Sequence, residues 1–157
     1  MQTAELERGG GRLKFAVSGR VHAPTLVLLH PLGANRDVWW PQLSTFEQFF
    51  HVVRPDLRGH GESGVSEGEP STRSLLDYVE DVLAILDHLH VDRAHWCGLS
   101  MGGAIALQAA IAQPKRVHRL VLANTAVEFG PSSRWDERVA LARSAGLHAV
   151  LASVRDR

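Results

Sequence analysis

The chain contains the stretch Gly98-Leu99-Ser100-Met101-Gly102-Gly103, in which small residues lie on both sides of a serine. An apolar run at residues 94–98 leads into it, and a helix of small apolar residues is expected over residues 101–112. A strand that turns directly into a helix leaves room only for very small residues beside the turning residue. The stretch therefore predicts a tight turn that lifts the Ser100 hydroxyl above a sheet, at the N-terminus of a helix.

Negative charge is stabilised at such a position, because the first amides of a helix lack acceptors and the helix dipole points its positive end there. Ser100 is therefore a candidate nucleophile. A second segment, His30-Pro31-Leu32-Gly33, directly follows the apolar run at residues 25–29. We expect His30 to shape the loop that follows this run. The alternative for Ser100 is a helix N-cap without chemical function.

Apolar runs and amphipathic stretches alternate along the chain up to residue 123. Gly9-Gly10-Gly11 predicts a turn that follows a polar leader. The alternation predicts an α/β fold with a doubly wound, mostly parallel sheet and right-handed crossovers. Strands are expected at residues 12–18, 25–29, 51–54, 94–98 and 117–122, and helices at residues 39–50, 74–88, 101–112, 134–144 and 147–154.

The composition is that of an ordinary folded domain, with 157 residues, 45% hydrophobic and 22% charged. The 17 Lys and Arg balance 17 Asp and Glu, and without a basic cluster we expect no nucleic-acid partner. No apolar run approaches the roughly 18 residues of a membrane span, so no membrane partner is expected. The charged start lacks the apolar stretch of a secretion signal, which predicts a cytoplasmic protein. Cys97 is the one cysteine and is expected to fill space in a strand.

Two further groups of polar residues are expected to serve structure rather than chemistry. In the glycine-rich stretch Pro55-Asp56-Leu57-Arg58-Gly59-His60-Gly61-Glu62-Ser63, Asp56 and Arg58 are expected to fix the loop. His88, His90 and His95 are close in sequence, but a spacing of two near a helix end does not bring side chains to one face. We therefore expect no metal site. We also expect no cofactor, because the glycines at 9–11 precede a strand instead of following one.

On these motifs the chain resembles the α/β-hydrolase family, over essentially all of residues 12–123. The matching segments are His30 to Gly33, Arg54 to Ser63 and Gly98 to Gly103, each after an expected strand. Within that family it is most similar to 3-oxoadipate enol-lactonases. That likeness rests on the segment Leu120-Val121-Leu122-Ala123-Asn124-Thr125-Ala126, and on Gly130, Trp135, Arg138 and Val139.

The resemblance implies the first six strands of an α/β-hydrolase core in residues 1–127, and the beginning of a helical cap in residues 128–157. It implies a small-molecule lactone or carboxylic ester as substrate, opened through an acyl-Ser100 intermediate, as in the catabolism of aromatic compounds. It also implies that the backbone N–H groups of Leu32 and Met101 stabilise the oxyanion. Trp135 is expected either to form an apolar wall of the substrate site or to pack on the core, and Arg138 is expected to face the substrate carboxylate. Arg134 is expected to lie in solvent.

The sequence departs from the family's order of catalytic residues, which runs from the serine to an acid and then to a histidine. Glu128 lies where some members carry the acid, but none of the nine histidines has the expected place. We therefore expect a truncated or partial hydrolase that is inactive alone. Because the apolar edge at residues 117–122 is unpaired, we expect the chain to be poorly stable, to self-associate through this edge or to pair with a partner. The alternatives are another hydrolase of the same core (an esterase, a C–C hydrolase or a haloperoxidase-like enzyme) and a catalytically inert fragment.

Overall fold

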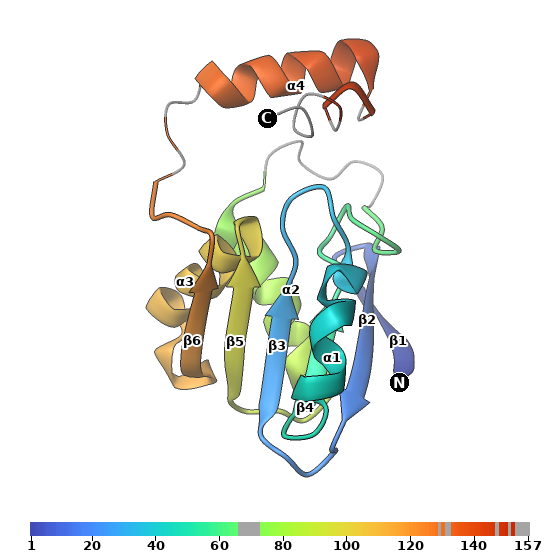
Figure 1. Cartoon of the computed structure of the whole chain (residues 1–157), viewed down its shortest axis with the longest axis vertical. Coiled ribbons are helices and arrows are strands. Elements are labelled where there is room, and N and C mark those ends of the chain that lie inside the picture. The colour runs from blue at the N-terminus through green and yellow to red at the C-terminus, as the bar shows by residue number, and fades with distance from the viewer. Residues whose placement is uncertain (66–72, 129, 131–132, 147, 151, 153–157) are drawn as a thin grey trace. The chain divides into compact units, whose positions relative to one another are not determined.

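The structure is a computed structural model that describes residues 1–65, 73–128, 130, 133–146, 148–150 and 152. The chain divides into two compact units, Met1–Ala126 and Val127–Arg157. The first unit contains a six-stranded sheet with the order β1-β2-β4-β3-β5-β6 (Figure 1). The assignment of the second unit to a helical cap stays a prediction.

Four parallel strands form the centre and one side of this sheet. β3 (Thr25–Leu29) pairs with β4 (His51–Pro55) and with β5 (Ala94–Leu99), and β5 also pairs with β6 (Val117–Ala123). Every residue of β3 and of β4 is buried, and β3 is a continuous apolar run of the kind that favours a strand covered on both faces. The predicted α/β fold with a doubly wound, mostly parallel sheet is confirmed.

The polar leader is a strand, which the sequence analysis did not predict. β1 (Gln2–Arg8) pairs in antiparallel register with β2 (Gly11–Gly19), and β2 pairs in antiparallel register with β4. Gly9 and Gly10 turn the chain with φ of 56° and 71°, so the predicted turn is confirmed. The expectation that these glycines do not follow a strand is wrong, because they join the end of β1 to the start of β2. β1 is an edge strand in which only Ala4 and Leu6 pack against the core. Because most of its residues are polar, β1 lacks the clear alternation of apolar and polar residues that predicts a strand.

Helices cover both faces of the sheet. α1 (Trp40–Phe46) lies on one face, where its Leu43 and the preceding Trp39 pack with Leu26 and Leu28. α2 (Leu75–His88) and α3 (Met101–Ala112) cover the larger core on the other face (Figure 1). This two-sided arrangement is the layer structure that alternating strands and helices produce.

Helix boundaries differ from the expected ones mainly around α1. A 3-10 turn, η1 (Arg36–Trp39), precedes it, and α1 ends four residues before the predicted residue 50. A second 3-10 turn, η2 (Pro114–Arg116), leads into β6. In the second unit α4 spans Ser133–Ala145, and residues 148–150 are helical. The remaining residues of the helix expected at 147–154 are outside the described ones, apart from residue 152.

β6 is the edge strand on the side away from β1. Its Val121 and Leu122 are 55% and 42% exposed, which agrees with the expected apolar edge. Self-association through this edge stays a prediction. In the described part of the chain, no helix is long and apolar enough to cross a membrane.

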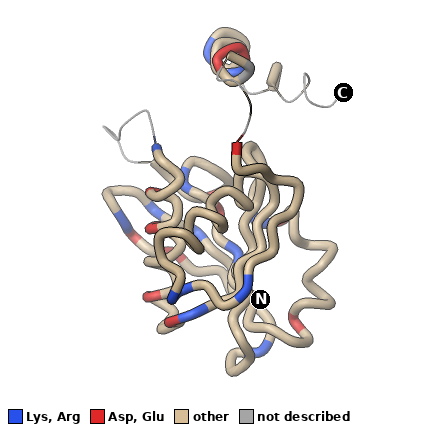
Figure 2. Tube along the Cα trace, turned by 90° about the vertical axis from the view of Figure 1, so that its left-hand side faces the viewer, with Lys and Arg blue, Asp and Glu red and all other residues tan. Residues whose placement is uncertain are grey.

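Basic and acidic residues are interspersed along the chain trace (Figure 2), and one buried pair ties three elements together. Arg58, in the loop after β4, donates from Nε and Nη2 to the two carboxylate oxygens of Asp81 on α2, over 2.8 and 2.7 Å. Arg8 at the end of β1 contacts the same carboxylate over 3.1 Å. The predicted loop-fixing role of Arg58 is therefore confirmed, and Asp81 is the partner.

We predict that Asp81→Asn destabilises the fold by about 3 kcal/mol, because it leaves a buried guanidinium without its counter-charge. Urea denaturation measures the loss. Glu80→Gln is the matched control, since Glu80 is the next residue, contacts Arg8 over 3.2 Å and is 56% exposed. The control should lose less than about 1 kcal/mol. Equal losses in the two variants would contradict a structural role for the buried pair.

Candidate active site

The backbone at Ser100 has a conformation that residues with a side chain rarely adopt. Ser100 links β5 to α3 with φ of 52° and ψ of −114°. Its N–H donates to the carbonyl of Ala123 at the end of β6, over 2.9 Å. Because a non-glycine residue outside the allowed regions costs free energy, such strain persists only where the surroundings enforce it, and it concentrates at functional sites.

The alternative of a serine N-cap does not fit this geometry. An N-cap residue has extended backbone angles, and its side-chain oxygen accepts a hydrogen bond from the helix. Ser100 precedes the first residue of α3, but its side chain makes no capping hydrogen bond and its φ is positive. The hydroxyl is therefore not used to terminate the helix, and the half-buried side chain is available for other contacts.

Three glycines allow the turn because other chain segments occupy the space of a side chain. A Cβ on Gly98 would lie 2.1 Å from the carbonyl oxygen of Gly102. A Cβ on Gly102 would lie 2.3 Å from the carbonyl oxygen of Leu29, and one on Gly103 would lie 2.7 Å from the Thr125 methyl carbon. The tight turn predicted from these glycines is confirmed, and it brings the start of α3 against the ends of β3 and β6.

The turn lies where the strand order reverses. The chain passes from β3 outward to β4 and then returns to β5 on the other side of β3. In open α/β sheets, the crevice at the carboxyl ends of such neighbouring strands is where ligands bind. Ser100 and His30 follow the carboxyl ends of β5 and β3. The topology therefore places both predicted segments at the carboxyl edge of the sheet, where the strand order reverses.

The segment after β3 forms a turn, in which the Ala34 N–H donates to the Pro31 carbonyl over 3.3 Å and Gly33 has φ of 75°. Leu32 within it is 54% exposed. Met101 is the first residue of α3, so its amide lacks an acceptor within the helix. The two elements that carry these amides meet at Gly102, but their joint use as an oxyanion site stays a prediction.

His30 is a structural residue, as expected. The Leu57 N–H donates to its Nε2 over 2.9 Å, so Nε2 carries no proton and Nδ1 donates to the Pro31 carbonyl over 2.8 Å. The ring is fully buried, and burial is the main cause that holds its pKa below the usual 6.5. The neutral imidazole thus joins the loop after β3 to the loop after β4.

Asp56 also fixes the loop, as predicted, but its partner was not found from the sequence. The buried carboxylate accepts hydrogen bonds from the Arg36 backbone N–H over 2.8 Å and from the Glu62 N–H over 2.9 Å, and it contacts the Arg36 guanidinium. Arg36 begins η1, twenty residues earlier. No periodicity connects residues at that separation, so only the folded chain reveals the pair.

The remaining histidines and the cysteine give no triad at Ser100. Among the described residues, none of the hydrogen bonds found joins a histidine or a carboxylate to the Ser100 hydroxyl. No group of three or more metal-ligating side chains is found in the described part of the chain. His95 pairs instead with His118 of the neighbouring strand. Cys97 is buried, and burial raises the pKa of its thiol, which keeps it unreactive.

Trp135 and Arg138, expected at the substrate, contact each other in the second unit. The Arg138 guanidinium lies 5.1 Å from the centre of the Trp135 ring, one helical turn apart on α4. The two units are described separately, so substrate binding by this pair stays a prediction. Glu128 is exposed in the second unit.

Comparisons with known proteins agree with this architecture. The family profile described as alpha/beta hydrolase fold matches residues 24–144. The 3-oxoadipate enol-lactonase 1 of Acinetobacter baylyi is 36% identical over 96% of this chain and 55% of the relative. A hydrolase from Pseudomonas aeruginosa PA01 superposes with a TM-score of 0.86 at 40% identity, covering 91% of this chain and 53% of the other.

The enol-lactonase from Burkholderia xenovorans LB400 superposes with a TM-score of 0.90 at 34% identity, covering 98% of this chain and 59% of the other. The chain thus spans about half the length of the relatives it matches.

We predict that Gly102→Ala destabilises the chain by at least about 2 kcal/mol, because its methyl group would meet the backbone of β3 rather than a movable side chain. Gly64→Ala is the control, since a Cβ there would have its nearest neighbour at 3.9 Å. Urea denaturation compares the two variants. An unchanged midpoint for Gly102→Ala would show that the turn is not tightly packed.

We also predict that part of the folding stability depends on His30 through pH. Because folding lowers the pKa of His30, the unfolded chain binds more protons below 6.5, so this contribution is complete above pH 6.5 and is lost as pH falls through the folded value. The free energy of unfolding should therefore fall less between pH 7 and pH 5 in His30→Asn than in the unchanged chain. His22→Asn, on an exposed turn, should keep the original slope.

Proposed function

This chain belongs to the alpha/beta hydrolase family, and from that premise we propose that it supplies the nucleophile-bearing part of a serine hydrolase acting on lactones or carboxylic esters. The observation that carries the proposal is the strained Ser100, which lies between the carboxyl end of β5 and the N-terminus of α3 and whose hydroxyl caps no helix. A turn of this kind is the known device for presenting a serine nucleophile.

In the proposed reaction, Ser100 Oγ attacks the carbonyl carbon of the substrate and loses its proton to a general base. The oxygen of the tetrahedral intermediate accepts hydrogen bonds from the N–H groups of Leu32 and Met101. The intermediate collapses by breaking the bond to the ring oxygen, which leaves an acyl-serine. Water then attacks the acyl group, and Ser100 regains its proton as the acid is released.

The base and its orienting acid are not assigned to any described residue. A serine hydroxyl is a weak nucleophile without an adjacent base, so the reaction needs a histidine in contact with Oγ and a carboxylate behind it. In this proposal, Ser100 is the nucleophile and the amides of Leu32 and Met101 stabilise the oxyanion. The described residues do not supply the proton acceptor. We expect the described unit alone to turn over slowly or not at all.

The substrate class follows from the relatives named as enol-lactonases. An enol-lactone of 3-oxoadipate carries a free carboxylate beside the ring, and ring opening expels an enolate that becomes a ketone on protonation. Arg138 would face that carboxylate, and Trp135 would cover the apolar part of the ring. The aromatic compounds whose breakdown yields such lactones define the proposed metabolic role. A cytoplasmic location stays a prediction, with which the single cysteine is compatible.

We predict that a fluorophosphonate labels Ser100 slowly, because the turn presents the serine oxygen beside two amides that stabilise an oxyanion, while no described residue activates the hydroxyl. Mass spectrometry of the digested protein locates the adduct. Ser100→Ala should abolish the labelling, and Ser144→Ala, on exposed α4, should retain it. The Acinetobacter relative serves as the positive control. No adduct on this chain beside full labelling of that control would favour an inert fragment.

The substrate class needs a second measurement on any preparation that is labelled. Enol-lactone hydrolysis should exceed the hydrolysis of neutral aryl esters of similar size. The reverse order would keep the serine hydrolase assignment and reject the lactone, leaving an esterase, a C–C hydrolase or a haloperoxidase-like enzyme on the same core.

A further inference from the structure

Two histidines from neighbouring parallel strands face each other on the side of the sheet that α1 covers. His95 is the second residue of β5, and His118 is the second residue of β6. Their Nδ1 atoms are 3.4 Å apart, and their rings meet edge to face with centroids 4.5 Å apart and an angle of 81°. His95 is half-buried, while His118 is exposed to solvent.

An irregularity in the sheet produces this pairing. Ala94 pairs with Val117 and Trp96 pairs with Leu120, so two residues of β6 oppose the single residue His95. A bulge of this kind redirects a side chain toward its neighbour. The pairing of His95 with His118 is therefore a property of the register between strands, which the spacing of histidines along the sequence does not reveal.

The separation of the two nitrogens equals the span of two ligands on a tetrahedral metal ion. Zinc binds histidine nitrogen at about 2.0–2.1 Å, so two such nitrogens at the tetrahedral angle are about 3.3–3.4 Å apart. Octahedral neighbours on the same ion would be closer, at about 2.9 Å. The measured 3.4 Å thus fits one tetrahedral ion between the two Nδ1 atoms without a change of strand position.

We propose that His95 and His118 bind one transition-metal dication of the zinc class through both Nδ1 lone pairs, with each ring proton on Nε2 and water in the remaining positions. Imidazole is the preferred protein ligand for such ions, and exposed His118 leaves a path for entry. Among the described residues the pair has no third protein ligand, so the site is weaker than a closed structural zinc site.

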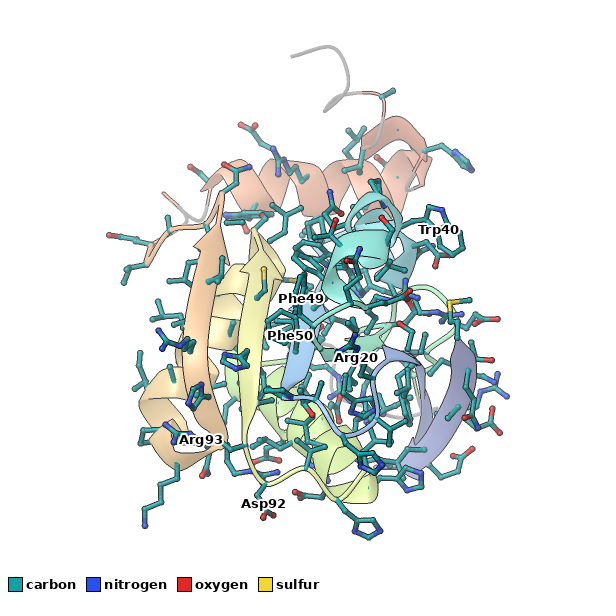
Figure 3. All side chains as sticks on the ribbon, turned by 60° about the horizontal axis from the view of Figure 1, so that its bottom comes forward. Arg20, Trp40, Phe49, Phe50, Asp92 and Arg93 are labelled. Carbon is teal, nitrogen blue, oxygen red and sulfur yellow. The ribbon has the colours of Figure 1, made fainter. Side chains whose placement is uncertain are left out.

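The surroundings of His95 favour a neutral ring that is ready to bind. Burial is the main cause that lowers its pKa, and the charges of His118, Arg119 and Arg93 lower it further. Phe50 packs its ring against that of His95, with centroids 5.6 Å apart, and so holds its orientation. Arg93 donates to the Val117 carbonyl over 3.2 Å, which anchors this cation at the start of β6 (Figure 3). The two arginines also repel a dication, which limits affinity.

The distance of His95 from Ser100 favours an ion that stabilises the fold over one that takes part in catalysis. His95 lies five residues before Ser100 along β5, which is about 16 Å at the rise of a strand. An ion between His95 and His118 would link β5 to the edge strand β6 at the end away from the crevice. Because the ion binds the two histidines together only in the folded state, it increases the free energy of unfolding. The inference does not depend on the proposed hydrolase function.

The test is titration of the whole chain with Zn²⁺, followed by calorimetry and by the thermal unfolding midpoint. We expect one ion per chain and a raised midpoint. His95→Gln and His118→Gln should each weaken binding at least about tenfold and remove the rise, because each deletes one of two ligands. His22→Gln, on an exposed turn, is the matched control and should bind as the unchanged chain does.

Imidazole ¹⁵N resonances of the unchanged chain provide a second measurement that needs no variant to fold. Zn²⁺ should shift the Nδ1 resonances of His95 and His118. Shifts confined to Nε2 or to other histidines would overturn the proposal, as would equal affinity in both variants and the control. In those cases the 3.4 Å contact is a hydrogen bond between two neutral rings only.

Discussion

Backbone packs directly against backbone where the first turn of α3 meets the ends of β3 and β5, and the remaining features of the first unit depend on this contact. Gly98 and Gly102 have carbonyl oxygens where a Cβ would project. Without side chains at these positions, α3 approaches the sheet closely enough for the chain to turn within one residue. Ser100 takes up the resulting strain, and the Ala123 carbonyl holds its amide. The close packing of α3 on the sheet therefore also determines how the Ser100 hydroxyl is presented.

Buried charges and a neutral histidine then hold the loops around this contact. His30 joins the loop after β3 to Leu57, Asp56 ties the following loop to Arg36, and Arg58 ties the same loop to Asp81 on α2. Each polar group is satisfied by a partner far away in sequence, which is the condition for burying it. The loops after β3 and β4 are thus held at the carboxyl edge of the sheet by these polar contacts, together with Leu57, which is buried in the larger core.

Structure could be predicted from the sequence where the interactions that determine it act between residues close together in the chain. The contact between Gly98 and Gly102 acts within six residues, so its requirement for space could be read directly, whereas the contacts of Gly102 with Leu29 and of Gly103 with Thr125 appeared only in the folded chain. β3, buried on both faces, was found from the uninterrupted apolar run at residues 25–29, and β4 was expected as a short strand at residues 51–54. β1 was missed because an edge strand needs only Ala4 and Leu6 toward the core. α1 was drawn too long because Phe49 and Phe50 continue an aromatic pattern after the helix has ended.

The sequence by itself determined the α/β architecture, the family, and the candidate nucleophile with its turn, because periodicity and glycine content act over a few residues. Only the tertiary structure decided which polar groups meet. The residues of each pair come from separate elements, and their spacing along the chain does not show that they meet. The pairs are Arg58 with Asp81, Asp56 with Arg36, and His95 with His118. The physical reason is that a buried charge or imidazole selects its partner by distance in space, after the apolar runs have already placed the strands.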